Sequence, residues 1–404
     1  MWRIVFQVFP LVVWCVAILV VVKPLKFTRR TSLVLSFVIL AALSKFAFFA
    51  VVGGNGFNPD LPAGLIWFCG WIYAAAILLT GFAFVCMIGD GILNLCRPPV
   101  RLRTKRIRTV LLTLAAAAVS LWGIYEGVCI PSVHRVEVFY NDLPPAFDGY
   151  RIVHLSDLHC STAARRERFE RIVARVNALA PDLIAITGDF VDGTPGERMN
   201  DLEPISRLKA KDGVWGCTGN HEAYWNWYGW ADLFRKWDVR ILSEHGVYSN
   251  SVIRRGESAL ALGGLTDPAF FKGAGYRLSA SSAFRNVPPG AFRILLAHRP
   301  FTERIGSAVA DVRLQLSGHT HGGAVPLLRL LVSYVNEGYV RGLYEFAPGR
   351  FLHVSPGTGQ WAGFPLRLFN PAEITEIVLR LSPQTSQPPN LQTSKLPNLQ
   401  TSTP

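Results

Sequence analysis

The sequence predicts an N-terminal, multi-span transmembrane α-helical region followed by an α/β domain. Four long apolar stretches lie within the first 130 of 404 residues, and five short apolar runs in the second part of the chain each lead into Asp, His, Asn or Gly residues. Stretches of about 20 apolar residues are long enough to cross the hydrocarbon core of a bilayer. Short apolar runs are typical of strands that are covered on both faces.

Four membrane spans are expected in the first region, at residues 4–22, 32–52, about 65–87 and 109–130. The first stretch has no small-residue cleavage site before Lys23 and Pro24. We therefore expect a retained span rather than a cleaved signal peptide.

Basic residues favour one orientation of these spans. Four Lys and Arg lie between residues 23 and 30, six lie between residues 97 and 108, and none lies between residues 53 and 62. By the positive-inside rule, the first and third loops are cytoplasmic. Four spans then place the α/β domain outside the cytoplasm of a multi-pass protein of the bacterial inner (plasma) membrane, whereas an odd number of spans would invert this topology.

Most of the net charge of +13 comes from the region of the expected membrane spans. Residues 1–130 hold 12 Lys and Arg against three Asp and Glu, which leaves a charge of only +4 for the remaining residues. The excess is therefore mostly a signal of membrane topology. Nucleic acid is not expected as a partner.

Five strands are expected in the second region, at residues 151–156, 182–187, 214–218, 292–297 and 312–317, with a helix at residues 165–180. Residues 131–148 are expected to form a linker, and residues 149–381 the α/β domain. Residues 382–404 are rich in Pro, Ser, Thr and Gln, a composition typical of disorder. Ligands of α/β folds gather beyond the carboxyl ends of strands, so the residues there can converge on one site.

The residues at these strand ends have the chemistry of metal ligands. Imidazole and carboxylate groups bind ions of borderline hardness, and two ions held close together need a carboxylate that bridges them. These donors do not distinguish manganese, iron, zinc and nickel. The clusters are Asp157-Leu158-His159, Gly188-Asp189-Phe190-Val191-Asp192, Gly219-Asn220-His221-Glu222, His298 and Gly318-His319-Thr320-His321-Gly322-Gly323.

The order of these clusters resembles that of the calcineurin-like metallophosphoesterase superfamily, which carries D-x-H, G-D-x-x-D, G-N-H-(D/E), a lone H and G-H-x-H. The resemblance extends from about residue 143 to residue 381. Segments 143–149, 263–268, 317–323, 354–359 and 370–374 look like the membrane-attached branch, which includes phosphodiesterase-type enzymes and hydrolases of UDP-2,3-diacylglucosamine. The implied fold is a four-layer α/β/β/α sandwich with two mixed sheets.

The resemblance also implies two divalent metal ions. Their shared water or hydroxide would attack phosphorus, because two cations lower the pKa of water. The implied ligands are Asp157, His159 and His321 for the first ion, Asn220, His298 and His319 for the second, and Asp189 as the bridge.

His221 resembles the general acid of the family, and Asp192 would orient it by accepting its other ring proton. Glu222 stands where many relatives have Asp, and we expect it to touch no ligand. Other interpretations stay open: His298 alone would more often be a core histidine, and Asp192 could cap the turn at Gly193. The domain could also retain its ligands without catalysis.

Some further His, Cys and aromatic residues carry less information. His154, His245 and His353 lack a motif and are expected to be structural, while Cys160 and Cys217 could form a disulfide or stay free. A helical spacing predicts core positions for Trp230, Leu233, Phe234 and Trp237. Outside that spacing lie four aromatic residues that suit either loop packing or a lipid interface, namely Tyr224, Trp225, Trp227 and Tyr228.

Together these observations predict a membrane-anchored phosphoesterase with two metal ions. Its substrate would be a phosphomonoester, phosphodiester or pyrophosphate, with lipid-linked molecules favoured by the membrane spans. The alternatives are a phosphatase that acts on soluble substrates and a non-enzymatic membrane interaction protein that retains the fold.

Overall fold

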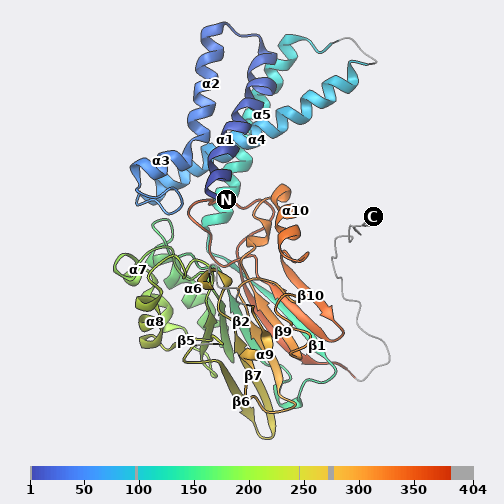
Figure 1. The fold of residues 1–404 in the computed structure, drawn as a ribbon. Coiled ribbons are helices and arrows are strands. Elements are labelled where there is room, and N and C mark those ends of the chain that lie inside the picture. Colours follow the sequence, from blue (N-terminus) through green and yellow to red (C-terminus); the bar gives the residue numbers. More distant parts are fainter. Residues whose placement is uncertain (1, 96–98, 245, 272–276, 384–404) are drawn as a thin grey trace. The chain divides into compact units, whose positions relative to one another are not determined.

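The computed structural model describes residues 2–95, 99–244, 246–271 and 277–383. The chain divides into two compact units (Figure 1). A helical unit comprises Met1–Cys129 with the short segments Ser161–Ala164 and Trp361–Phe369, and an α/β unit comprises Ile130–Cys160, Arg165–Gln360 and Asn370–Pro404. The tail expected from residue 382 lies outside the described residues, apart from residues 382 and 383.

Among its described residues, the helical unit has three helices that are long and apolar enough to cross a membrane, at residues 8–25, 63–93 and 102–128. A fourth candidate is the pair α2 and α3, which is bent by 61° and passes the same test when taken together. The predicted count of four spans thus depends on whether this pair crosses as one span. The helices are α1 (Trp2–Ala17), α2 (Arg29–Leu43), α3 (Lys45–Val52), α4 (Ala63–Leu93) and α5 (Leu102–Val128), with the short helices η1 (Ile18–Val22) and η2 (Lys23–Leu25) after α1.

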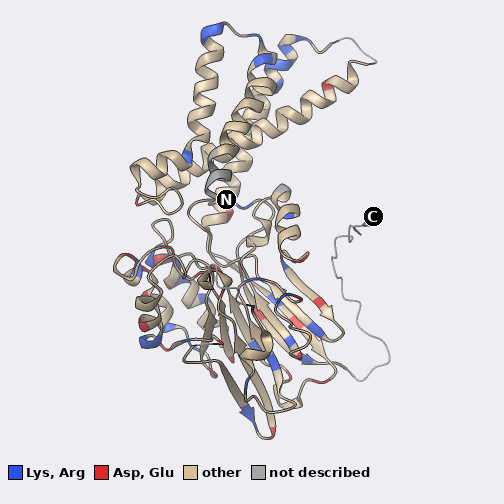
Figure 2. Cartoon of the chain, viewed as in Figure 1, with Lys and Arg blue, Asp and Glu red and all other residues tan. Residues whose placement is uncertain are grey.

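The first and third loops of the helical unit lie at the same end of that unit. Arg106, near the start of α5, donates hydrogen bonds of 3.2 and 3.1 Å to the carbonyl oxygen of Leu25 in η2. Figure 2 shows Lys and Arg gathered at this end of the helices. The arrangement agrees with two basic loops on one side of a bilayer, as the positive-inside rule requires.

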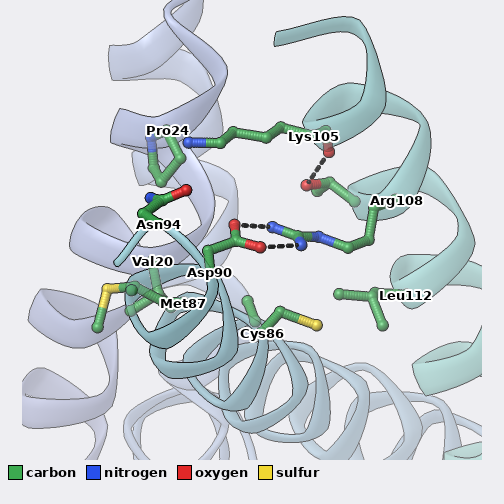
Figure 3. Close-up of a pocket in the computed structure, with 12 residues that line it drawn as sticks. Val20, Pro24, Cys86, Met87, Asp90, Asn94, Lys105, Arg108 and Leu112 are labelled. Carbon is green, nitrogen blue, oxygen red and sulfur yellow. Dashed lines mark hydrogen bonds and ion pairs between the residues drawn. The ribbon is translucent and has the colours of Figure 1, made fainter. Parts of the chain in front are cut away.

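A pocket at this end lies between η1, α4 and α5 (Figure 3). Arg108 of α5 forms two hydrogen bonds of 2.7 Å with the carboxylate of Asp90 of α4 across it. A paired charge is the form in which ionisable groups are tolerated inside a helical bundle. The pair therefore ties α4 to α5.

The α/β unit contains two six-stranded mixed sheets, as the predicted sandwich requires. The first sheet has the order β1-β12-β2-β3-β4-β5, and the second has the order β10-β11-β9-β8-β7-β6. The strands of the first sheet are β1 (Ser132–Tyr140), β2 (Arg151–Leu155), β3 (Leu183–Thr187), β4 (Val214–Cys217), β5 (Val239–Ile241) and β12 (Glu373–Leu381). Those of the second are β6 (Asn250–Arg255), β7 (Ser258–Gly264), β8 (Phe292–Leu296), β9 (Val312–Ser317), β10 (Gly342–Ala347) and β11 (Arg350–Val354).

A hydrophobic core fills the space between the two sheets. It includes Ile152 and Leu183 of the first sheet and Leu260, Ile294 and Leu314 of the second, none of which is exposed. Helices cover the outer faces and complete the four-layer sandwich. They are α6 (Arg166–Ala178), α7 (Pro195–Leu202), α8 (Trp227–Lys236) and α9 (Ala280–Ala283), whereas α10 (Pro326–Val335) packs against the short helix η6 (His321–Gly323).

The five expected strands are all present, but residues 132–140 differ from the expected linker because they form strand β1. This strand pairs with β12 in parallel over nine residue pairs. Its Tyr140 is buried and packs edge-on against Phe292 and Phe351 of the second sheet, with ring centroids 4.9 and 5.3 Å away. Successive side chains of a strand point to opposite faces, so alternate apolar residues of this segment can be buried. This burial explains why the segment forms a strand rather than a linker.

Replacement of Tyr140 tests whether β1 belongs to the core. Tyr140→Ala should lower the free energy of unfolding of the α/β unit by about 3–5 kcal/mol, because it removes a buried aromatic side chain between the sheets. Pulse proteolysis in urea of the purified chain in detergent would measure this. Val133→Ala, on the exposed part of the same strand, is the control and should change stability by less than about 0.5 kcal/mol. Equal effects would mean that β1 is a peripheral linker.

Candidate metal centre

All nine predicted metal-ligating and catalytic residues lie beyond the carboxyl ends of five strands. Strands β2, β3 and β4 are parallel neighbours in the first sheet, and β8 and β9 are parallel neighbours in the second. Equivalent strand ends meet at one edge of a parallel sheet, which brings the loops together. The residues are Asp157 and His159 after β2, Asp189 and Asp192 after β3, Asn220 and His221 after β4, His298 after β8, and His319 and His321 after β9.

Asp157, His159 and His321 form a first group of converging donor atoms. Nε2 of His321 lies 3.5 Å from Oδ1 of Asp157 and 3.2 Å from Nε2 of His159. Asp157 and His159 are completely buried. Such a set of imidazole nitrogens and a carboxylate suits a divalent cation of borderline hardness.

Asp189, His298 and His319 form a second group. Nε2 of His298 lies 3.3 Å from Oδ2 of Asp189 and 3.2 Å from Nδ1 of His319. The same Asp189 oxygen lies 3.7 Å from Nε2 of His159 in the first group. Asp189 therefore occupies the position between the groups that a bridging carboxylate needs.

Asn220 provides an independent test of whether a cation fits here. Its side chain is only 7% exposed, and its Oδ1 atom accepts no hydrogen bond within the part of the chain that the structure describes. A buried acceptor without a partner is costly unless it meets a donor or a cation. The buried Oδ1 atom of Asn220 is thus available as a ligand for a cation.

The backbone is unusual at five of these residues. Left-handed φ values of 46–68° occur at Asp157, His159, Asp189, His319 and His321. Non-glycine residues rarely adopt this conformation, and it concentrates at functional sites where the surroundings enforce it. The strand-to-loop turns thus aim these side chains at the cost of local strain.

Two further interactions fix how the imidazoles are turned. Nδ1 of His298 donates to the carbonyl oxygen of Thr187 at 2.7 Å, which leaves Nε2 free to face Asp189. Asp192 accepts from Nδ1 of His221 and, at 3.1 Å, from Nδ1 of His159. The expected contact between Asp192 and His221 is present, and the same carboxylate also orients a candidate ligand.

Charges within the centre shift the pKa of His221. Burial alone would lower it, but the carboxylates of Asp189 and Asp192 raise it to about 10. Burial would raise the pKa of Asp192, whereas the His221 and His159 imidazoles hold it below its ordinary value. These carboxylates therefore favour the protonated form of His221, the form that a general acid requires.

Glu222 was expected to touch no ligand, and this expectation is wrong. Its buried carboxylate accepts backbone N–H groups from Asp189 at 2.9 Å, Phe190 at 2.7 Å and Gly219 at 2.7 Å. Burial raises the pKa of Glu222 to about 7, and the hydrogen bond from the Gly219 N–H opposes this rise. Glu222 holds the loop that carries Asp189 to the loop that carries Asn220.

Arg299 is a neighbour of the centre that the sequence did not reveal. Its Nη1 atom lies 3.3 Å from Nε2 of His319, while its Nε and Nη2 atoms bind the buried carboxylate of Asp267 at 2.8 and 3.2 Å. The sequence contains both partners, in the pair His298-Arg299 and in segment 263–268. It does not show that Arg299 pairs with a residue 32 positions away. A fixed guanidinium beside the donors suits an anionic substrate.

The residues expected to be structural show no contact with the two groups of donors among the described interactions. His154 and His353 are buried and lie 3.0 Å apart through their Nδ1 atoms. Burial lowers the pKa of both, that of His353 to about 3, so they are neutral. Cys160 and Cys217 are free thiols, and His245 lies outside the described residues.

The aromatic segment divides into core and surface. Trp230 and Phe234 are fully buried, as the helical spacing predicts, whereas Leu233 and Trp237 are only partly buried. Trp227 packs against Phe270. Tyr224 and Tyr228 are 52% and 85% exposed. The exposed aromatic side chains are therefore the tyrosines rather than Trp227.

The two facing mixed sheets and the buried His and Asp groups define the class of protein, and similarity to known proteins agrees with it. Residues 150–323 match the family model of the calcineurin-like phosphoesterases. A metallophosphoesterase of Aquifex aeolicus is 30% identical over 232 residues, which cover 57% of this chain and 85% of that protein. The chain belongs to the calcineurin-like metallophosphoesterase family.

Other similarities extend beyond that domain. A bovine protein named transmembrane protein with metallophosphoesterase domain is 31% identical over 290 residues, which cover 70% of this chain. The match spans 64% of the bovine protein. The crystal structure of a putative 5'-nucleotidase from Staphylococcus aureus aligns with a TM-score of 0.37 and 12% identity, covering 60% of this chain and 56% of that one.

Removal of the Glu222 carboxylate should disrupt the two loops that support the candidate metal centre. Glu222→Ala leaves three buried N–H groups without an acceptor, at about 1–3 kcal/mol each, and should both destabilise the unit and lower its metal content. Glu222→Gln keeps one accepting oxygen and should have a smaller effect. Glu257→Ala on an exposed turn is the control. Wild-type metal content and stability in Glu222→Ala, measured by elemental analysis and pulse proteolysis, would contradict the assigned role.

Proposed function

We propose that this chain is a membrane-anchored, metal-dependent phosphoesterase with two divalent cations. The observation that carries this proposal is the position of Asp189, whose Oδ2 lies 3.7 Å from His159 in one group and 3.3 Å from His298 in the other. We assign Asp157, His159 and His321 to one cation and Asn220, His298 and His319 to the other. Manganese, iron, zinc and nickel all suit these donors.

The cations would supply Lewis acidity toward a phosphoryl group and lower the pKa of a water molecule. The chain supplies the proton for the leaving oxygen. His221 holds its Nδ1 proton against Asp192, so its Nε2 atom, 3.9 Å from Asp189, is the atom that delivers a proton. Arg299 lies beside His319 and supplies positive charge to a bound phosphate.

We propose a lipid-linked phosphomonoester, phosphodiester or pyrophosphate as the substrate. Only residues 129–131 separate α5 from β1, and three extended residues span at most about 11 Å. The α/β unit is therefore tethered to the bilayer, where such substrates reside. The basic loops favour an extracytoplasmic domain on a bacterial plasma membrane when the bent helix pair counts as one span. A phosphatase acting on soluble substrates is the second candidate, because the partly exposed His221 can also be reached from water.

Replacement of the shared carboxylate tests the metal centre. Asp189→Asn should abolish hydrolysis of bis(p-nitrophenyl) phosphate and remove at least one metal ion per chain, because the Asp189 carboxylate faces both donor groups. Elemental analysis and turnover of the purified full chain would measure both effects. Asp232→Asn, at an exposed ion pair of α8, is the matched control. Two bound ions with near-wild-type turnover in Asp189→Asn would overturn the proposal.

Replacement of the general acid should depend on the leaving group. His221→Ala should slow hydrolysis of alkyl phosphate esters by about 10²- to 10⁴-fold while affecting nitrophenyl esters much less, because only basic leaving oxygens need the proton. The ratio of the two kcat/KM values gives the measurement. An equal loss on both substrates would assign His221 to positioning or metal binding instead.

A further inference from the structure

Helix α10 (Pro326–Val335) exposes its apolar side chains. No α10 residue whose side chain is described is buried. The helix directly follows η6 (His321–Gly323), the turn that carries a candidate metal ligand. The exposed fractions are 40% for Leu328, 67% for Leu330, 51% for Leu331, 85% for Tyr334 and 43% for Val335.

The polarity of α10 is the inverse of that of a soluble surface helix. At about 100° per residue, the five exposed apolar residues form one continuous face, which covers roughly 160° of the helix. Its polar residues Arg329 and Ser333 lie outside that face and are less exposed. A soluble helix turns its apolar face inward, whereas a contiguous exposed apolar face marks an interaction surface.

We propose that the apolar face of α10 inserts into the interfacial layer of the bilayer that anchors this chain. Under the proposed function, the candidate spans at residues 63–93 and 102–128 anchor the chain in a membrane, and the three residues between α5 and β1 keep that membrane within reach of the α/β unit. The bilayer is thus the apolar surface that is most accessible to α10. The composition fits as well, because leucines suit the acyl boundary and Tyr334 combines an apolar ring with a polar tip.

This membrane contact would lie next to the turn that carries His321. α10 packs against η6. A side-chain carbon at Gly323 would lie only 2.7 Å from the Cα atom of Arg329, so the helix touches the backbone of the His321 turn. The carbonyl oxygen of His321 also accepts from Asn370 at 2.5 Å, which fixes the turn from the other side. The proposal concerns the membrane contact of α10 and does not depend on hydrolytic activity.

Site-specific fluorescence quenching tests the contact in the full chain. The environment-sensitive fluorescent amino acid Anap is introduced as Leu330→Anap, and the protein is reconstituted into liposomes of phosphatidylcholine and phosphatidylglycerol. Doxyl groups near the headgroup end of the acyl chains should quench this probe, while aqueous iodide should not. Val309→Anap is the control, because Val309 is 88% exposed and precedes the opposite end of β9. Doxyl quenching should be roughly threefold stronger at position 330 than at position 309.

The other outcomes overturn the proposal. Strong iodide quenching at position 330 would show that α10 faces water. Protection from both quenchers would show that protein covers it, either a second copy or other helices of this chain. Hydrogen exchange of the unlabelled protein in nanodiscs provides a second measurement: α10 amides should exchange about tenfold faster in Leu330→Asp/Leu331→Asp than in wild type, with β9 unchanged. Equal exchange in both proteins would also reject the contact.

Discussion

The candidate metal centre depends on two carboxylates, Asp157 and Asp189, that lie together out of contact with water. Burial raises the pKa of Asp157, and Asp189 adds to that rise although His298 opposes it. Burial also acts on Asp189, but the His298 and His221 imidazoles hold its pKa well below the ordinary value. Like charges in a buried space require opposite charge at close range. Imidazoles supply that charge only when protonated, whereas divalent cations supply it in all states, which is why the donor set is best understood as a metal centre.

The remaining structure holds these donors against their mutual repulsion. Left-handed backbone at Asp157 and Asp189 costs free energy that the surrounding hydrogen bonds must offset. Glu222 contributes to these hydrogen bonds by accepting the N–H groups of Asp189 and Gly219. The two loops also approach each other closely, since a side-chain carbon at Gly219 would lie only 2.4 Å from the backbone nitrogen of Asp189. The loops after β3 and β4 therefore form one rigid support.

The sequence predicted the five strands that carry the clusters because each is a short apolar run that leads into its polar residues. It did not predict β1, whose alternating pattern is weak until Tyr140 meets Phe292 and Phe351 across the core. The nine site residues followed from the resemblance of the five clusters to the calcineurin-like metallophosphoesterases, and seven of them lie in the converging groups of donor atoms. The sequence did not reveal the role of Glu222 or the contact of Arg299 with His319, because these depend on backbone turns and on pairs of residues distant in sequence. Local patterns specify which groups are present, and tertiary contacts decide what supports them.

Asp192 couples the two functions of the centre. Its two oxygens accept from Nδ1 of His159, a candidate ligand, and from Nδ1 of His221, the candidate acid. Each imidazole is thereby turned so that Nε2 points toward Asp189, at 3.7 and 3.9 Å. Because one carboxylate fixes both rings, the acid cannot shift relative to the ligand without breaking a buried hydrogen bond. Positioning of the candidate proton donor is therefore set by the same carboxylate that orients a candidate metal ligand, so a change at Asp192 would affect both imidazoles, whereas a change at His221 leaves the contact with His159 in place.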